Sequence, residues 1–177
     1  MARVKRTERS RKEHICGRGG HVIPKGDPYL SASPGYHGST IYRCVNHPFR
    51  PSELTRSARS APLSALEAWQ DAVSAGIESH DDLESEWDAL GDALTEFLEE
   101  REQALEAWEN GNGQLEELMD TAQAAVDEWD SHSLEAFDEE EPEDTDSEEW
   151  QEWDERRREH LEEQVNEADS IAGGIEV

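Results

Sequence analysis

The sequence contains no long apolar stretch. No run approaches the roughly 18 residues that a membrane-spanning helix requires, and residues 1–15 lack the apolar core of a secretion signal. We therefore expect a cytoplasmic protein that is neither secreted nor inserted in a membrane. Cysteine is also scarce. The two cysteines have histidines nearby, and in a chain without a secretion signal this favours metal ligands over a disulfide.

Apolar residues make up only 34% of the 177 positions, and only some of them fall in patterns suited to burial. A single large core is not expected, and local helical packing together with a bound metal is a more economical route to order. Lysine is nearly absent, with 3 Lys against 13 Arg and 44 Asp and Glu. Scarce lysine together with abundant carboxylates is typical of proteins from a salt-loaded, halophilic cytoplasm. An ordinary acidic interaction tail is the alternative interpretation.

The charges are divided unevenly along the chain. Residues 1–60 hold 12 Lys and Arg against 4 Asp and Glu, a net charge of +8. Residues 61–177 hold 4 Lys and Arg against 40 Asp and Glu, a net charge of −36, which gives −28 for the whole chain. The sequence therefore predicts a basic N-terminal module followed by a strongly acidic part.

The basic part divides into two segments. Residues 1–13 are polar and have no apolar period, which predicts a flexible basic arm. Residues 14–56 form a Cys/His module in which residues 29–32 and 40–43 look like short strands joined by a Ser-Pro-Gly-Tyr-His-Gly-Ser loop.

Residues 62–137 have helical periodicity. Pro62 marks a first-turn position, and apolar residues then recur at helical spacing. Two heptad-like stripes, separated by Asn110-Gly111-Asn112-Gly113, predict an antiparallel helical hairpin or coiled coil. The first stripe comprises Leu83, Trp87, Leu90, Leu94, Phe97, Ala104 and Trp108, and the second comprises Leu115, Leu118, Ala122, Ala125 and Trp129.

The remainder of the chain is more polar. Residues 138–149 contain no apolar side chain apart from a proline, which predicts a disordered acidic linker. Residues 150–170 have a thin apolar face and predict a weak last helix. The expected fold is a small α+β protein: a zinc-ribbon-like β-hairpin module followed by an antiparallel helical hairpin.

A metal site is expected within the Cys/His module. Cys44 and His47 have the two-residue spacing that lets a tight turn aim both side chains at one ion. The partner pair should include Cys16, but glycine stands at position 19 where a second ligand is expected. His21 is the best substitute and His14 the second choice, so the proposed set is Cys16, His21, Cys44 and His47, holding a structural Zn²⁺. A degenerated site that folds without metal, or packed free thiols, are the alternatives.

These residues carry a resemblance to a known family. The runs Cys16-Gly-Arg-Gly-Gly-His-Val-Ile-Pro-Lys-Gly-Asp-Pro-Tyr29 and Tyr42-Arg-Cys-Val-Asn-His-Pro-Phe-Arg-Pro-Ser-Glu-Leu-Thr55 resemble small zinc-ribbon proteins of tailed viruses. The ligand pattern is more remotely similar to the zinc finger of poly(ADP-ribose) polymerases. The resemblance implies zinc ligands at Cys16, Cys44 and His47, a viral context in a host cell or virion, and no established activity. Gly19 departs from the family pattern.

The basic residues suggest a nucleic-acid partner, because cations and interleaved tyrosines are suited to phosphates and bases. The competing reading is that the arm packs on the protein's own acidic tail. The candidate nucleic-acid-binding residues are Arg3, Lys5, Arg6, Arg9, Arg11, Lys12, Arg18, Lys25 and Arg43.

Three functions remain open at this point. The first is a non-enzymatic zinc-ribbon accessory or regulatory protein that binds nucleic acid. The second is a viral assembly adaptor that contacts a protein partner, or itself, through helices within residues 62–131. The third is an acidic tail that mimics nucleic-acid phosphates. An enzyme is not expected, because the carboxylates lie in solvated helical or linker segments and no phosphate-binding loop or Ser-His-Asp pattern is present.

Overall fold

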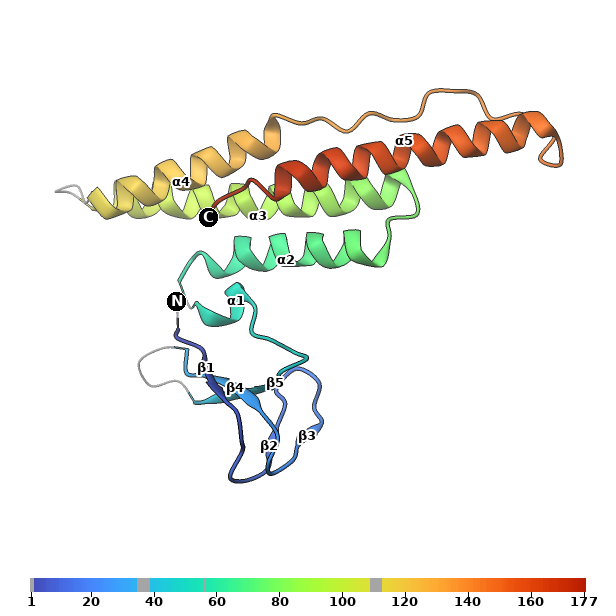
Figure 1. Ribbon diagram of the computed structural model, residues 1–177. Coiled ribbons are helices and arrows are strands. Elements are labelled where there is room, and N and C mark those ends of the chain that lie inside the picture. The colour runs from blue at the N-terminus through green and yellow to red at the C-terminus, as the bar shows by residue number, and fades with distance from the viewer. Residues whose placement is uncertain (1, 35–38, 56, 109–112) are drawn as a thin grey trace. The chain divides into compact units, whose positions relative to one another are not determined.

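The computed structural model describes residues 2–34, 39–55, 57–108 and 113–177. The protein is a small α+β protein with antiparallel strands in its N-terminal part and helices in its C-terminal part (Figure 1). The chain divides into two compact units, residues 1–67 and 68–177. Within the described segments, no helix is long and apolar enough to cross a membrane.

The N-terminal unit is built on short antiparallel strands. A three-stranded sheet has the order β1-β4-β5, formed by Lys5–Thr7, Tyr29–Ala32 and Ile41–Cys44. A second pair, β2 and β3, joins His14–Ile15 to Val22–Ile23. The two strands expected from residues 29–32 and 40–43 are therefore present. Most of the Ser-Pro-Gly-Tyr-His-Gly-Ser loop between them, including Tyr36, lies outside the described residues.

The basic arm is an ordered part of the sheet, which corrects the expectation of a flexible segment. Lys5 pairs with Ser31 and Thr7 pairs with Tyr29, so the arm supplies an edge strand. Further along, the Ser10 N–H donates to the Asp27 carbonyl at 2.9 Å and the Gly26 N–H donates to the Ser10 carbonyl at 2.9 Å. The segment has no apolar period because backbone pairing, and not side-chain burial, fixes it.

Two helices follow the strands. Helix α1 is a single turn, Pro51–Leu54, and α2 covers Ser60–Ala75, beginning two residues before Pro62. The Arg50 N–H donates to the Glu53 Oε2 at 3.0 Å, and the Ser52 N–H donates to the Glu67 Oε1 at 2.9 Å. These contacts hold the start of α1 and link it to α2.

Helices α3 (His80–Glu106) and α4 (Gly113–Asp130) pack against each other. The N-terminal half of the first predicted stripe is buried as expected, from Leu83 through Phe97. Trp129 of α4 lies directly against Gly91 of α3, and the Trp129 indole N–H donates to the Trp87 carbonyl at 3.1 Å. Trp108, at the other end of the stripe, lies beyond α3 and is 55% exposed. The predicted Asn-Gly turn falls mostly outside the described residues.

The last helix is longer than predicted. Helix α5 covers Glu148–Ala172 and begins after Ser147, whose side chain accepts a hydrogen bond from the Trp150 N–H. The acidic segment before it contains no helix or strand until Glu148, yet its Glu139 carbonyl accepts a hydrogen bond from the Trp153 indole at 3.2 Å. The predicted start at residue 150 is two residues late, because the glutamates at 148–149 were assigned to the acidic linker. A serine followed by glutamates is, however, a helix-start signal.

Candidate metal centre

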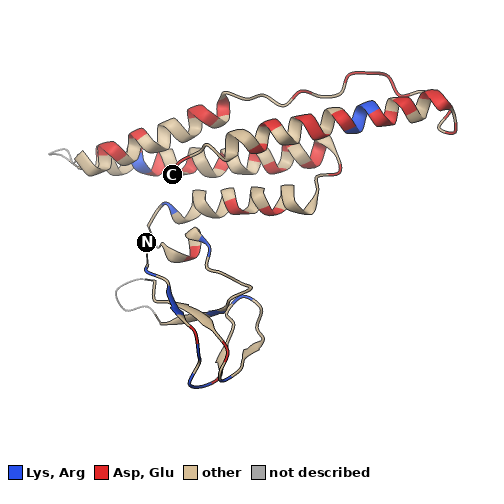
Figure 2. Ribbon diagram, in the orientation of Figure 1, with Lys and Arg blue, Asp and Glu red and all other residues tan. Residues whose placement is uncertain are grey.

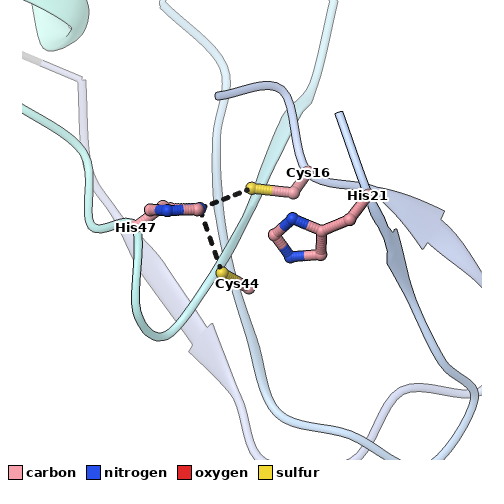
Figure 3. Close-up of side chains that lie close together, drawn as sticks. All are labelled: Cys16, His21, Cys44 and His47. Atoms are coloured by element: carbon pink, nitrogen blue, oxygen red, sulfur yellow. Dashed lines mark hydrogen bonds between the residues drawn. The ribbon is translucent and has the colours of Figure 1, made fainter. Parts of the chain in front are cut away.

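Four side chains from distant parts of the sequence converge in the N-terminal unit: Cys16, His21, Cys44 and His47 (Figure 3). One potential ligand atom from each residue lies within 4.8 Å of all the others. The His47 Nδ1 lies 3.6 Å from the Cys16 Sγ and 3.4 Å from the Cys44 Sγ. The cysteines form no disulfide. The set predicted from the sequence is thus brought together, and it can hold a metal ion.

Two turns aim these side chains. Cys16 follows β2, where its N–H donates to the His21 carbonyl and its carbonyl accepts from the Gly20 N–H, closing the loop between β2 and β3. Cys44 is the last residue of β5, and its carbonyl accepts from the His47 N–H at 3.0 Å. Each pair of candidate ligands therefore sits on one tight, hydrogen-bonded turn.

The glycine at position 19 is explained by space. A Cβ built there would lie 2.6 Å from the His21 Nδ1 and 2.8 Å from the His47 Cε1, which is closer than Cβ atoms approach other groups. The space beside position 19 is thus occupied by the His21 and His47 rings, and any side chain there would displace one of them. The glycine at this position is therefore compatible with the observed cluster.

The Cys16 sulfur is fully buried in a polar environment. Burial raises the pKa of its thiol. Backbone N–H groups of Cys44, Gly19 and Arg18, together with the His47 ring, outweigh burial and lower the pKa to about 6. The thiolate is the form of cysteine that binds metals, so this environment favours ligation at neutral pH.

His14, the second choice for a ligand, lies outside the cluster. Its ring stacks on Tyr42, with ring centroids 3.9 Å apart, and contacts Tyr29. Another group, His80, Asp81 and Glu84, also has side-chain atoms within 4.8 Å of one another. It lies at the start of α3, where exposed carboxylates are common without any metal.

Arg43 is the one predicted nucleic-acid contact that the structure removes from the surface. It is 6% exposed, its guanidinium is ion-paired with Glu53, and its charge lies over the Phe49 ring. A Cβ at Gly17 would lie 2.5 Å from the Arg43 Nη1, so the loop that carries Cys16 packs directly on this guanidinium. Arg43 supports the ligand loop and is not available to phosphates.

The role of Glu53 could not be seen from the sequence. Burial raises the pKa of its carboxyl group, but the Arg50 N–H and the Arg43 guanidinium lower it more, so the pKa lies below its ordinary value. The only sequence signal was the Arg-Pro-Ser-Glu run, which carries no indication of its partner.

We expect Glu53→Gln to lower the free energy of unfolding of this unit by about 2 kcal/mol, because it leaves a buried guanidinium without its counter-charge. The expected loss of stability is smaller than for a fully buried ion pair, since the Glu53 side chain is 26% exposed. Because the folded-state pKa is lowered, the contribution is present above the ordinary carboxyl pKa and is lost as pH falls through the lowered value. Hydrogen exchange of β4 and β5 measures it.

The exposed Glu13→Gln is the matched control for this variant and should match wild type. The difference between wild type and Glu53→Gln should shrink as the pH is lowered, since protonated Glu53 resembles glutamine. A difference that persists unchanged at low pH would contradict the ion pair.

The remaining predicted cations are exposed. Lys5, Arg6, Arg9, Arg11 and Lys12 lie together along and after β1, where they border one surface hollow with Tyr29 and Tyr42. Arg3 precedes the strand, Arg18 lies in the loop after Cys16, and Lys25 lies in the turn between β3 and β4; none of these three borders the hollow. Figure 2 shows Lys and Arg gathered in the strand-rich unit and Asp and Glu along the helices.

Comparison of the chain with known protein families, with curated proteins and with solved structures finds no match.

Proposed function

We propose that the N-terminal unit is a zinc-ribbon-like module that binds nucleic acid through its basic strand, and that the protein is a non-enzymatic accessory or regulatory factor. The observation that carries the proposal is the placement of the arm. Its cations lie along and just after an edge strand of the same unit that contains the Cys/His cluster. The resemblance to small zinc-ribbon proteins of tailed viruses supports the ribbon part of the proposal.

Zinc is the metal that the four residues fit best. Zn–S distances of about 2.3 Å and Zn–N distances of about 2.0 Å in a tetrahedron place sulfur and nitrogen roughly 3.5 Å apart. The two sulfur–nitrogen separations on His47 are 3.6 and 3.4 Å. Two thiolates and two imidazoles fill a tetrahedral site and leave no position for a substrate, so the zinc would be structural.

His21 is the ligand on which this assignment depends most. We expect His21→Ala to weaken zinc binding by more than the 10- to 100-fold that loss of an outer-shell partner costs. His21→Ala vacates the space into which the Gly19 Cβ direction points, so Gly19→Cys should restore a ligand in that background once the His47 ring, whose Cε1 would lie 2.8 Å from the new Cβ, shifts by a few tenths of an ångström. Competition with a coloured zinc chelator measures both affinities.

Arg18→Cys in the same His21→Ala background is the control, since it adds a thiol one position away on an exposed side chain. It should not restore binding. Wild-type affinity in His21→Ala would show that the fourth ligand lies elsewhere.

The charge distribution supports a phosphate partner. Residues 2–13 hold six cations against Glu8 and Glu13. Among described residues, Lys5, Arg9, Arg11 and Lys12 form no ion pair, whereas Arg6 is bridged to Glu8 at 2.8 Å. Unpaired cations at fixed positions can displace counterions from a phosphate chain without first breaking internal bridges.

The adaptor alternative depends on the helices. Trp69 and Trp87 are buried against each other, and Trp129 packs on α3 of the same chain, so most of the proposed contact stripe is already used internally. Trp108 is the exposed member that remains for a protein partner. This leaves less apolar surface for assembly than the sequence suggested, which favours the nucleic-acid proposal.

Binding of the full-length protein to short DNA and RNA strands and to duplexes, followed by fluorescence anisotropy over a series of salt concentrations, tests the proposal. Affinity should fall as salt rises, and Arg11→Gln should reduce the logarithmic salt slope by about 0.9 for a duplex or 0.7 for a single strand. Arg156→Gln, which removes an exposed arginine from α5, should leave the slope unchanged. Absence of binding to every strand at low salt would overturn the proposal.

A further inference from the structure

A hollow of about 700 Å³ lies beside β1. Cations of the arm, including Lys5, Arg9 and Arg11, border it, and aromatic residues from three other strands line it. It differs from a plain basic surface because half-buried tyrosine rings lie among the charges.

The strand register explains how the hollow is built. Lys5 pairs with Ser31 and Ser31 pairs with Tyr42, while Thr7 pairs with Tyr29. Directly paired residues of antiparallel strands place their side chains on the same face, so the Lys5 and Thr7 side chains share a face with both tyrosines. The hollow therefore combines charge from β1 with rings from β4, the central strand, and β5, the opposite edge.

The aromatic side chains support one another. The His14 ring from β2 stacks on Tyr42 with centroids 3.9 Å apart and lies 4.7 Å from Tyr29, and the two tyrosines meet edge to face at 5.6 Å. His14 is buried, whereas both tyrosines are half-buried. The histidine thus supports both tyrosine rings, which keep part of their surface exposed where they line the hollow.

We propose that this hollow binds single-stranded nucleic acid, with phosphates held by Lys5, Arg9 and Arg11 and one unstacked base lying against Tyr29 and Tyr42. This rests on the proposed function and specifies its substrate. Base–aromatic stacking is tolerant of sequence because every base has a π-face, so recognition here is of strandedness and not of sequence.

A duplex does not meet both requirements. Its bases are stacked on one another, and their faces cannot reach recessed rings without unpairing. A duplex would contact the cations alone, as it would any basic surface. Substitution of the aromatic residues should therefore affect single-strand binding and duplex binding differently, whereas substitution of the cations should weaken both.

The test compares an oligothymidylate, an oligouridylate and a mixed-sequence duplex of equal length, each bound to the full-length zinc-loaded protein at low salt. We expect the single strands to bind more tightly than the duplex. Tyr29→Leu and Tyr42→Leu, which keep an apolar side chain, should each weaken single-strand binding about tenfold, as for loss of one stacked base. Both should leave duplex binding unchanged. Comparison of the oligothymidylate with the oligouridylate shows whether the preferred single strand is DNA or RNA.

Photocrosslinking of the wild-type protein needs no variant and guards against misfolding. Strands that carry 5-bromouracil should crosslink to Tyr29 or Tyr42, as mapped by mass spectrometry. Two results would overturn the inference: crosslinks that all fall elsewhere, or tyrosine variants that fold and bind single strands as wild type does. Either result would leave salt-dependent binding, and hence the proposed function, in place. Failure to bind either strands or duplex would overturn both.

Discussion

The Cys44→Ser variant should lose the folded structure of the N-terminal unit while its helical unit stays folded. Among the described residues of the N-terminal unit, the buried apolar side chains are few: Cys16, Ile23, Ala32 and two prolines. So small a core does not offset the conformational entropy of ordering more than 50 residues. Structural zinc contributes about 10–16 kcal/mol to the folding of zinc-finger peptides.

Hydrogen exchange measured by mass spectrometry resolves the two units in one experiment. In Cys44→Ser, amides of β4 and β5 should exchange at the rate of an unfolded chain, and those of α3 should keep their wild-type protection. Val45→Ser, which changes the exposed neighbour, is the matched control and should behave as wild type. Protected strands in Cys44→Ser would mean that the unit folds without the zinc proposed for it.

Gly91→Leu should lower the free energy of unfolding of the helical unit by about 3 kcal/mol. A Cβ at this position would lie 2.2 Å from the Trp129 Cζ2, so any side chain displaces the indole from its place against α3. Displacement also breaks the Trp129 hydrogen bond to the Trp87 carbonyl and opens the contact between the two indoles. Glycine normally weakens a helix interior, so a substitution that ought to help the helix instead opens its packing.

Urea unfolding followed by tryptophan fluorescence measures this loss. Ala89→Leu adds a similar side chain two residues away at an exposed position of α3 and should change stability by less than about 0.5 kcal/mol. Equal stability of Gly91→Leu and wild type would contradict the packing of α4 on α3 through Trp129.

The sequence predicted which four side chains converge because the candidate ligand types stand at a characteristic spacing. Cys44 and His47 stand two residues apart, and few other donors were available near Cys16. It predicted the buried stripe of α3 for the same reason, since helical periodicity is a local property. The sequence could not show why glycine stands at position 19. A position that has lost its ligand and a position kept small by a neighbouring ring both carry glycine, and only the structure places the ring.

Features that depend on pairing between distant segments were missed. The arm was predicted to be flexible because a three-residue strand is too short to show an alternating pattern, and its pairing with residues 29–31 is not visible in the sequence. The sequence pattern of Arg43 is that of a surface cation, because its burial depends on contacts with Gly17 and Glu53, which are distant in the sequence. Trp108 fits the predicted stripe by spacing, yet α3 ends at Glu106 and leaves it exposed.

Native mass spectrometry with zinc quantification tests the central claim most directly. The full-length protein, purified without chelator, should carry one zinc per chain, and His21→Ala and Cys44→Ser should each lose it while His14→Ala retains it, since His14 lies outside the cluster. Protein that folds with no zinc, or a zinc that survives both ligand substitutions, would contradict the account.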